Sequence, residues 1–268
     1  MLPRAILFDM DDTLISAYRQ PEKAWQDIAV EFAAEFGAVP PAMVADAVSV
    51  AAAAFWSDES RHRVGRLNLL DARRDIVLEG FSFVAAQGFA VPGADVAARM
   101  SARYHTYREE QMYLFPHAHE VVDTLRDRGV RLALITNGAA APQRAKVERF
   151  GFSERFHHIQ IEGEHGFGKP EERAYLFALS VLGVRAHETW MVGDNLEWEV
   201  MAPQRLGIHA VWHDSLGAGL PAGTPARPDR IITGLRELWG EGGLFSWFCR
   251  PAGQMLLRVI VDLSLALP

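Results

Sequence analysis

The sequence Ala5-Ile6-Leu7-Phe8-Asp9-Met10-Asp11-Asp12-Thr13-Leu14 decides the fold. Its first four residues are apolar and predict a buried strand. The strand leads directly into three carboxylates within four positions. Because like charges repel, such a group indicates a bound divalent cation, and Mg²⁺ prefers carboxylate and carbonyl oxygens. A helix N-cap would account for Asp12 or Thr13, but not for Asp9 and Asp11 as well.

Length, charge and cysteine content narrow the class of protein. The chain has 268 residues, enough for a sizeable core with or without a smaller module. Its formal net charge of −7 provides no basic field for a nucleic acid. The single cysteine, Cys249, cannot form an intrachain disulfide. The apolar run after Arg4 stops at Asp9, too early for a secretory signal, so we expect a cytoplasmic protein.

Residues 16–113 have helical spacing and no clear strand. The pattern predicts helices at 21–37, 43–56, 67–86 and 95–110. About a hundred helical residues that follow the first strand indicate a separate lid at the carboxyl end of that strand. We therefore expect a core formed by residues 1–15 and 114–240, with 16–113 as an inserted helical domain.

From residue 115 onward helices and strands alternate. Apolar strands are predicted at 130–135, 158–161, 190–192, 208–212 and 230–232, with helices between the first four of them. The last helix before residue 208 is predicted at 196–206. Repeated strand–helix units of this kind are typical of the α/β class with a doubly wound parallel sheet.

The terminal segment 241–268 does not fit this pattern. Residues 255–267 are strongly apolar, but Arg258 and Asp262 interrupt them. The segment is too short and too charged to span a membrane, so no membrane partner is expected. Instead of spanning a membrane, the segment could form a helix that docks on the core or on a second subunit. Docking on a second subunit would give a homodimer.

Polar residues follow three of the predicted strands. Asp9 and Asp11 follow the first, Thr136-Asn137 follows the strand at 130–135, and Gly193-Asp194 follows the strand at 190–192, while Lys169-Pro170 lies between the last two. Alone, Thr136 or Asp194 could cap a helix and Lys169 could be a solvated loop residue. Ligands in such sheets bind beyond the carboxyl ends of the strands, so we expect all of these side chains in one pocket.

These residues resemble the four motifs of the haloacid dehalogenase (HAD) superfamily: Asp9-Met10-Asp11-Asp12-Thr13, then Thr136, then Lys169-Pro170, then Gly193-Asp194 with Glu197 or Glu199. The helical insertion after the first motif resembles the C1-type cap of subfamily I. The resemblance covers about residues 4 to 240. It implies a Rossmann-like core, Mg²⁺ as cofactor and a phosphoaspartyl intermediate.

The resemblance also implies roles for single residues. Asp9 is the nucleophile, and Asp11 protonates the leaving oxygen and later deprotonates water. Mg²⁺ is bound by the Asp9 side chain, the Asp11 carbonyl and the Asp194 side chain. Thr136, with its neighbour Asn137, and Lys169 bind the phosphoryl group. The fourth-motif acid, Glu199 or Glu197, steadies a metal-bound water or Lys169.

The expected function is hydrolysis of a small phosphorylated metabolite, a phosphomonoester. The acid at position 11 indicates phosphoryl transfer rather than dehalogenation, because a halide leaves without a proton. A phosphomutase and a non-enzymatic phospho-acceptor or regulatory protein are the alternatives.

The insertion contains a basic segment, Ser60-Arg61-His62-Arg63-Val64-Gly65-Arg66. Arg61, Arg63 and Arg66 could contact a second anionic group on the substrate. A solvated loop between two helices is the other interpretation of this segment.

Overall fold

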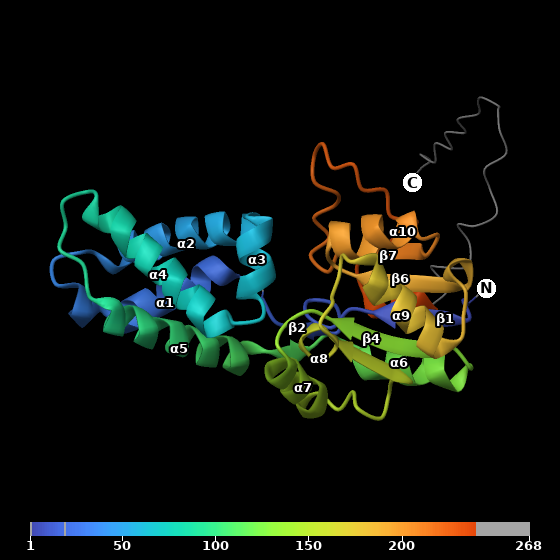
Figure 1. Ribbon diagram of the computed structural model, residues 1–268. Helices are drawn as coiled ribbons and strands as arrows, with labels where there is room; N and C mark the ends of the chain where they lie inside the picture. Colours follow the sequence, from blue (N-terminus) through green and yellow to red (C-terminus); the bar gives the residue numbers. More distant parts are fainter. Residues whose placement is uncertain (1, 19, 240–268) are drawn as a thin grey trace, which may run out of the picture.

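The computed structural model describes residues 2–18 and 20–239; the segment 241–268, and with it the alternative of a docked helix, lies outside this range. One part of the molecule is an α/β layer structure built on a six-stranded sheet (Figure 1). Its elements, in chain order, are β1 (Ala5–Phe8), α6 (Ala118–Asp127), β4 (Arg131–Thr136), α7 (Ala140–Arg149), β5 (His158–Ile161), α8 (Glu162–His165), α9 (Glu172–Leu182), η2 (Ala186–Glu188), β6 (Thr189–Gly193), η3 (Leu196–Met201), α10 (Ala202–Arg205), β7 (His209–His213), β8 (Arg230–Ile232) and η4 (Leu235–Leu238).

The strands have the order β5-β4-β1-β6-β7-β8, and every pairing in this sheet is parallel. The predicted α/β class with a parallel sheet is therefore confirmed. In the register Phe8 lies beside Leu134 of β4 and Val192 of β6. Asp9, Thr136 and Asp194 consequently end their strands at the same edge of the sheet, where the strand order reverses on either side of β1.

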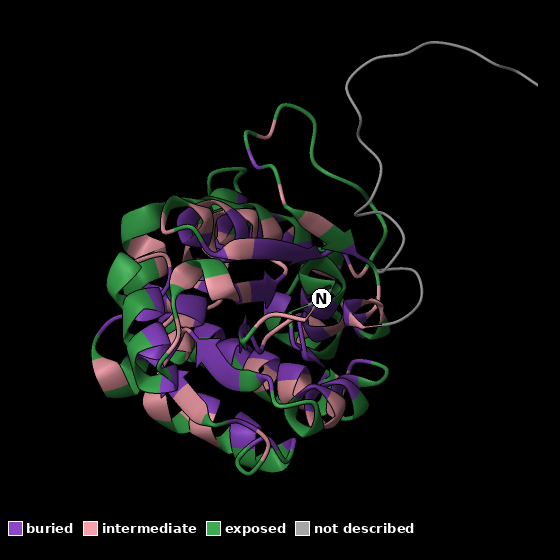
Figure 2. Cartoon of the chain, turned by 90° about the vertical axis from the view of Figure 1, so that its right-hand side faces the viewer, coloured by how far each residue is buried: buried purple, intermediate pink, exposed green. Residues whose placement is uncertain are grey.

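Side chains of the central strands alternate between two hydrophobic clusters. Ile6 and Phe8 pack with residues of α6 and α7, whereas Ala5 and Leu7 pack with residues of α9 and α10. This alternation follows from the two-residue period of a strand. Figure 2 shows the sheet as a buried layer between its helices. Helices on both faces make the sheet doubly wound, as expected.

A tight turn separates β1 from the helical part of the chain. Asp12 has a positive φ of 60°, and its carboxylate accepts a hydrogen bond of 2.8 Å from the Ala17 N–H. The chain then forms β2 (Ile15–Ser16), which pairs antiparallel with β3 (Tyr113–Leu114). The sequence predicted no strand at either position. The β2–β3 pair brings the two connections of the helical insertion side by side (Figure 1).

Between β2 and β3 the chain forms helices that pack on one another around a hydrophobic cluster of their own. They are α1 (Pro21–Glu31), η1 (Ala33–Phe36), α2 (Pro41–Ser57), α3 (Glu59–Gly65), α4 (Leu69–Ala85) and α5 (Ala94–Gln111). We call α1–α5 the helical insertion. The predicted helix 21–37 is split, because a 3₁₀ turn replaces its last part. The basic segment 60–66 lies largely in α3, so the loop interpretation is wrong.

The helix predicted at 196–206 also differs from the structure. It begins as the π-helix η3 and becomes α-helical only at α10. Pro203 has no N–H to donate to a carbonyl one turn earlier, which favours a break in regular hydrogen bonding at this point. The wider turn of η3 carries Glu199 into the interior, where it is 1% exposed.

Candidate active site

A cavity of about 570 Å³ lies between the carboxyl edge of the sheet and the helical insertion. The sheet edge contributes all of the residues expected at the strand ends: Asp9, Asp11, Thr136, Asn137, Lys169, Asp194 and Glu199. The insertion contributes aromatic and basic residues, among them Trp25, Trp56, His62, Arg66, Arg73 and Tyr104. The structure thus brings the candidate residues of four separate segments into one cavity.

Lys169 lies between two carboxylates. Its Nζ donates to Asp9 Oδ1 at 2.6 Å and to Glu199 Oε1 at 2.7 Å, and the residue is 1% exposed. Burial opposes the charged form, but Asp9 and Glu199 outweigh it and raise the pKa of Lys169 above its ordinary value. An ammonium group has three donors, so Lys169 keeps one for a further acceptor in the cavity.

Asp9 has one oxygen engaged and one free. Oδ2 is buried and has no hydrogen-bond partner among the described residues. Burial raises the pKa of Asp9, and the charge of Lys169 opposes that rise. A buried carboxylate oxygen without a partner is costly. At this position, therefore, the free oxygen indicates a site for bond formation or metal binding.

Glu199 anchors Lys169 from the other side. Besides the bond to Lys169, its Oε2 accepts the Asn195 N–H at 2.8 Å, and burial raises the pKa of Glu199 to about 7. A Cβ on Gly193 would lie 2.0 Å from Glu199 Cγ, so only glycine leaves room for this side chain. Glu197, the alternative fourth-motif acid, instead pairs with Arg205 at the surface.

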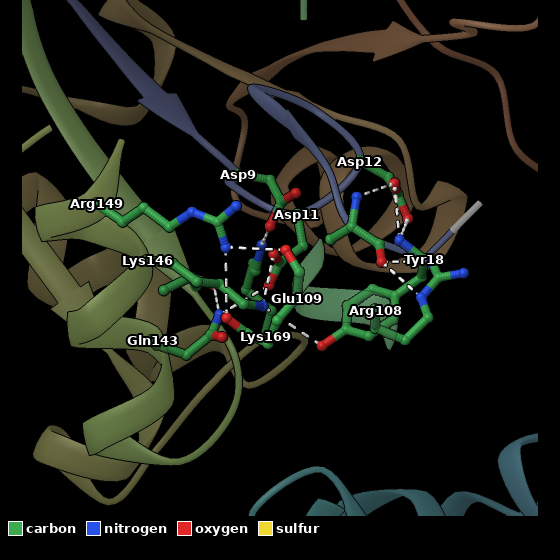
Figure 3. A network of polar contacts seen from close by, with 12 residues as sticks. Asp9, Asp11, Asp12, Tyr18, Arg108, Glu109, Gln143, Lys146, Arg149 and Lys169 are labelled. Atoms are coloured by element: carbon green, nitrogen blue, oxygen red, sulfur yellow. Dashed lines mark hydrogen bonds and ion pairs between the residues drawn. The ribbon is translucent and has the colours of Figure 1, made fainter. Parts of the chain in front are cut away.

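Asp11 is held by two residues that the sequence analysis missed, Lys146 and Gln143 of α7 (Figure 3). Lys146 Nζ lies 2.8 Å from Asp11 Oδ1, and Gln143 Nε2 donates to Asp11 Oδ2 at 2.8 Å. Gln143 Nε2 is also 2.5 Å from Thr136 Oγ1. Because the Thr136 oxygen accepts there, its own O–H is left to donate into the cavity.

Asn137 fixes the segment that carries Lys169. Its side-chain amide donates to the Lys169 carbonyl at 2.6 Å and accepts the Lys169 N–H at 2.9 Å. These two bonds tie the end of β4 to the loop that follows α8. The role of Asn137 in the structure is therefore to position the lysine.

The three arginines of the basic segment have different surroundings. Arg66 lines the cavity and makes a buried bidentate pair with Glu162, with distances of 2.6 Å and 2.8 Å. Arg61 pairs with Glu79 at 2.6 Å, and Arg63 pairs with Glu171 at 3.4 Å. Neither Arg61 nor Arg63 belongs to the lining of the cavity. The structure therefore brings only Arg66 to the site, and there its charge is already compensated.

The acidic residues fit a hard divalent cation. Burial and the charges of Asp9 and Glu199 raise the pKa of Asp194 well above its ordinary value. Three acidic side chains, those of Asp9, Asp194 and Glu199, thus lie near one lysine, Lys169. Within residues 2–18 and 20–239 no three His, Cys, Asp or Glu side chains form a ready metal cluster. The expected metal ligands are the Asp9 and Asp194 carboxylates and the Asp11 carbonyl, a set that includes no third acid. Both oxygens of Glu199 already accept hydrogen bonds.

Comparison with known proteins identifies the family. A family model described as haloacid dehalogenase-like hydrolase matches residues 3–207, which is most of the chain. The chain therefore belongs to the haloacid dehalogenase-like hydrolase family, as the motifs predicted.

Several curated relatives are phosphatases. A phosphoserine phosphatase of Thermus thermophilus is 39% identical over 135 residues, which are 50% of this chain and 53% of that enzyme. A ribulose-1,5-bisphosphate 5-phosphatase of Halopiger xanaduensis is 35% identical over 123 residues, 46% of this chain and 51% of that protein. The chain thus spans about half the length of these two relatives. A glyceraldehyde 3-phosphate phosphatase of Methanopyrus kandleri is 25% identical over 78% of this chain and 82% of its own length.

Solved structures support the fold. The HAD-hydrolase YfnB of Bacillus subtilis, described as bound to magnesium, has a TM-score of 0.62 at 20% identity, with 89% of this chain and 98% of that chain covered. At identities this low the likeness concerns the fold alone. None of the helices in the described part of the chain has the length and apolar character needed to cross a membrane.

Proposed function

We propose that the protein is a Mg²⁺-dependent phosphohydrolase that acts on a small phosphorylated metabolite through an aspartyl phosphate at Asp9. The observation that carries the proposal is the state of the Asp9 carboxylate. Lys169 holds Oδ1 at 2.6 Å, while the buried Oδ2 is free among the described residues and belongs to a residue that lines the cavity. The phosphatase relatives support the same reaction class.

In the first step an Asp9 oxygen forms a bond to phosphorus and the bond from phosphorus to the leaving oxygen breaks. Asp11 enters this step protonated and gives its proton to that oxygen, so the product leaves as an alcohol. Lys169 and the Thr136 hydroxyl donate to the phosphoryl oxygens, where negative charge must be stabilised. Lys146 and Gln143 fix the Asp11 side chain during the transfer.

In the second step water attacks the phosphorus of the aspartyl phosphate. Asp11, now a carboxylate, takes the proton from that water. The bond between phosphorus and Asp9 breaks, which releases inorganic phosphate and restores both aspartates. Asp11 therefore acts first as an acid and then as a base, because it loses a proton in the first step and regains one from water in the second.

The carboxylates of Asp9 and Asp194 and the Asp11 carbonyl would hold the metal ion. Mg²⁺ supplies charge neutralisation between the anionic nucleophile and the anionic substrate. Glu199 does not bind the metal directly in this proposal; it keeps Lys169 in place.

We further propose that the helical insertion is a cap domain, residues 16–113, over a catalytic core of residues 1–15 and 114–240. The insertion supplies the wall of the cavity opposite Asp9. A wall at that position would contact the leaving group and exclude water from the phosphoryl group.

The test is hydrolysis of p-nitrophenyl phosphate with Mg²⁺ by the parent protein, Asp9→Asn and the control Asp46→Asn, which alters an exposed acid of α2. We expect turnover by the parent and the control, loss of at least about 10³-fold in Asp9→Asn, and loss on chelation. Acid quench and borohydride reduction should convert an acyl phosphate at position 9 to homoserine, which mass spectrometry detects.

Parent-like turnover by Asp9→Asn, or turnover that survives thorough chelation, would refute the proposal. A phospho-acceptor protein would give the acyl phosphate without steady release of phosphate. A phosphomutase would transfer the phosphoryl group to a second substrate hydroxyl instead of water, so steady release of free phosphate distinguishes a phosphatase from both alternatives.

A further inference from the structure

Arg73 of α4 is a buried cation on the wall of the cavity. The residue is 4% exposed and belongs to the cavity lining together with Asp9 and Lys169. Its polar contact is with His105 Nδ1 at 3.3 Å, and its guanidinium carbon lies 4.9 Å from the centre of the Tyr104 ring. No carboxylate of the described residues comes within ion-pair distance of it. Charged side chains are rarely buried unless they are paired.

The three arginines of the basic segment, by contrast, have acidic partners. Arg66 pairs with Glu162, Arg61 with Glu79 and Arg63 with Glu171. The nearby Glu109 influences Arg73 through space, but it already pairs with Arg149 at 3.5 Å (Figure 3). Burial lowers the pKa of Arg73, yet a guanidinium stays protonated in proteins. Arg73 is therefore a positive charge with no counterion at ion-pair distance among the described residues.

The cavity connects this charge to the reaction site. One end holds Asp9 and Lys169, and the wall provided by the insertion includes Trp25, Trp56 and Tyr104 beside Arg73. A phosphoryl group at Asp9 would direct its leaving group toward that wall. The volume of about 570 Å³ has room for a small-molecule leaving group beside the phosphoryl group.

We propose that Arg73 binds a second anionic group, a carboxylate or a second phosphoryl group, on the leaving group of the substrate. The planar fork of a guanidinium suits bidentate recognition of either anion. This inference rests on the proposed phosphatase function and narrows its substrate class. Arg73, which lines the cavity, thus takes the role that the sequence suggested for Arg61 and Arg63, which do not line it.

The experiment compares three phosphomonoesters with the same carbon chain: propyl phosphate, 3-(phosphooxy)propanoate and 1,3-propanediol bisphosphate. They differ only in a neutral, carboxylate or phosphate end group. The proteins are the parent, Arg73→Gln, Arg73→Lys and the control Arg74→Gln. Arg74 is the next residue of α4, half exposed and paired with Asp71 and Asp75, and it does not line the cavity.

We expect the parent to prefer at least one anionic substrate over propyl phosphate by tenfold or more in kcat/KM. In Arg73→Gln that preference should fall by about 10- to 100-fold, mainly through KM, because hydrogen bonds to a charged group are lost. Arg73→Lys should retain part of the preference. Arg74→Gln should behave like the parent. Which anionic substrate loses most identifies the carboxylate or the phosphate as the recognised group.

Equal loss on all three substrates, or no preference in the parent, would overturn the inference, because a structural role of Arg73 predicts a general loss. Thermal unfolding of each variant checks that it folds. If Arg73→Gln does not fold, Arg73→Lys takes its place in the comparison with the parent. Absence of any turnover by the parent, including p-nitrophenyl phosphate, instead contradicts the proposed function. Equilibrium binding of 3-(phosphooxy)propanoate and of 1,3-propanediol bisphosphate then decides for Arg73, and equal affinities of parent and Arg73→Gln for both compounds reject its role.

Discussion

At the scale of single residues, the acidic and basic groups at the sheet edge depend on one another. Lys169 stays charged although it is buried, because Asp9 and Glu199 accept hydrogen bonds from it. The orientation of Asp11 depends on Lys146 and Gln143. The sequence indicated a functional role for Asp9 and Asp11 because they follow a predicted strand, and for Lys169 because it belongs to one of the four motifs. It gave no such signal for Gln143 and Lys146, since a polar residue and a lysine on a helix normally face solvent.

Lys146→Met should separate the orientation of Asp11 from general stability. The substitution keeps the length of the side chain but leaves Asp11 with Gln143 as its side-chain donor. We expect kcat to fall by about 10- to 100-fold for an alkyl phosphate, which is part of the roughly 10²- to 10⁴-fold that general acid catalysis contributes, because Gln143 still holds Asp11. The fall should be smaller for p-nitrophenyl phosphate, whose leaving group needs less protonation.

The measurement is the dependence of kcat on the pKa of the leaving alcohol. Lys23→Met is the control, because Lys23 is exposed and forms an ion pair with Asp27 of its own helix, away from Asp11. An equal fall for good and poor leaving groups would mean that Lys146 supports the fold and not the proton transfer.

Gly193→Ala tests how closely Glu199 must approach the end of β6. A Cβ at position 193 would meet Glu199 Cγ at 2.0 Å and force the carboxylate away from Lys169. We expect a loss of about 1–3 kcal/mol in the free energy of unfolding together with loss of phosphatase activity. The control is Gly234→Ala, where the nearest atom to a Cβ is 3.9 Å away. Full activity in Gly193→Ala would contradict the role given to Glu199.

At the scale of helices and strands, the sequence predicted regular elements well and irregular ones poorly. Apolar runs identified β1, β4 and β6, because a buried parallel strand leaves a continuous apolar signal. The strands β5, β7 and β8, whose apolar runs are interrupted or short, were also predicted. The two-residue strands β2 and β3 leave no periodic signal. The sequence also predicted a helix at 196–206, but its first part is the π-helix η3, which the Asn195 side chain caps and which ends near Pro203, a residue without an N–H.

The edge strand β5 carries a histidine whose ionisation affects stability. Burial lowers the pKa of His158, and the nearby His165 acts in the same direction. Below the ordinary pKa of 6.5 the unfolded chain therefore binds more protons at this position than the folded chain. The stability that neutral His158 contributes is present above that pH and is lost as the pH falls through the lowered pKa.

His158→Phe should remove this dependence, since a phenyl ring can keep the contacts with Phe177 and His165. Urea unfolding at pH 7.5 and pH 5.5 measures the effect. We expect the free energy of unfolding of the variant, relative to the parent, to increase as the pH falls. A difference that does not change with pH would show that His158 contributes no proton linkage.

At the scale of the whole molecule, the helical insertion and the α/β part meet around the cavity. The cavity lining includes residues of both, and the two connections at β2 and β3 lie together on one side. One buried ion pair, between Arg66 of the insertion and Glu162 of α8, bridges the two parts, with side chains only 12% and 6% exposed. Glu162 also accepts the Gly138 N–H at 3.0 Å, so the pair reaches the loop after β4. The contact therefore couples the position of the insertion to the loop that follows Thr136.

Removal of one partner of this pair should cost more than removal of both charges. Arg66→Met leaves the Glu162 carboxylate buried without its cation, and breaking a buried pair in this way costs about 3–5 kcal/mol. Arg66→Met combined with Glu162→Gln leaves no charge behind and keeps an oxygen for Gly138, so it should be less destabilised than Arg66→Met alone. Arg63→Met is the control, because the exposed pair with Glu171 should contribute less than about 1 kcal/mol. Urea unfolding of the four proteins gives the comparison. If the double variant is as unstable as Arg66→Met, the lost contact between the insertion and the core, and not the uncompensated charge, determines the stability of this interface.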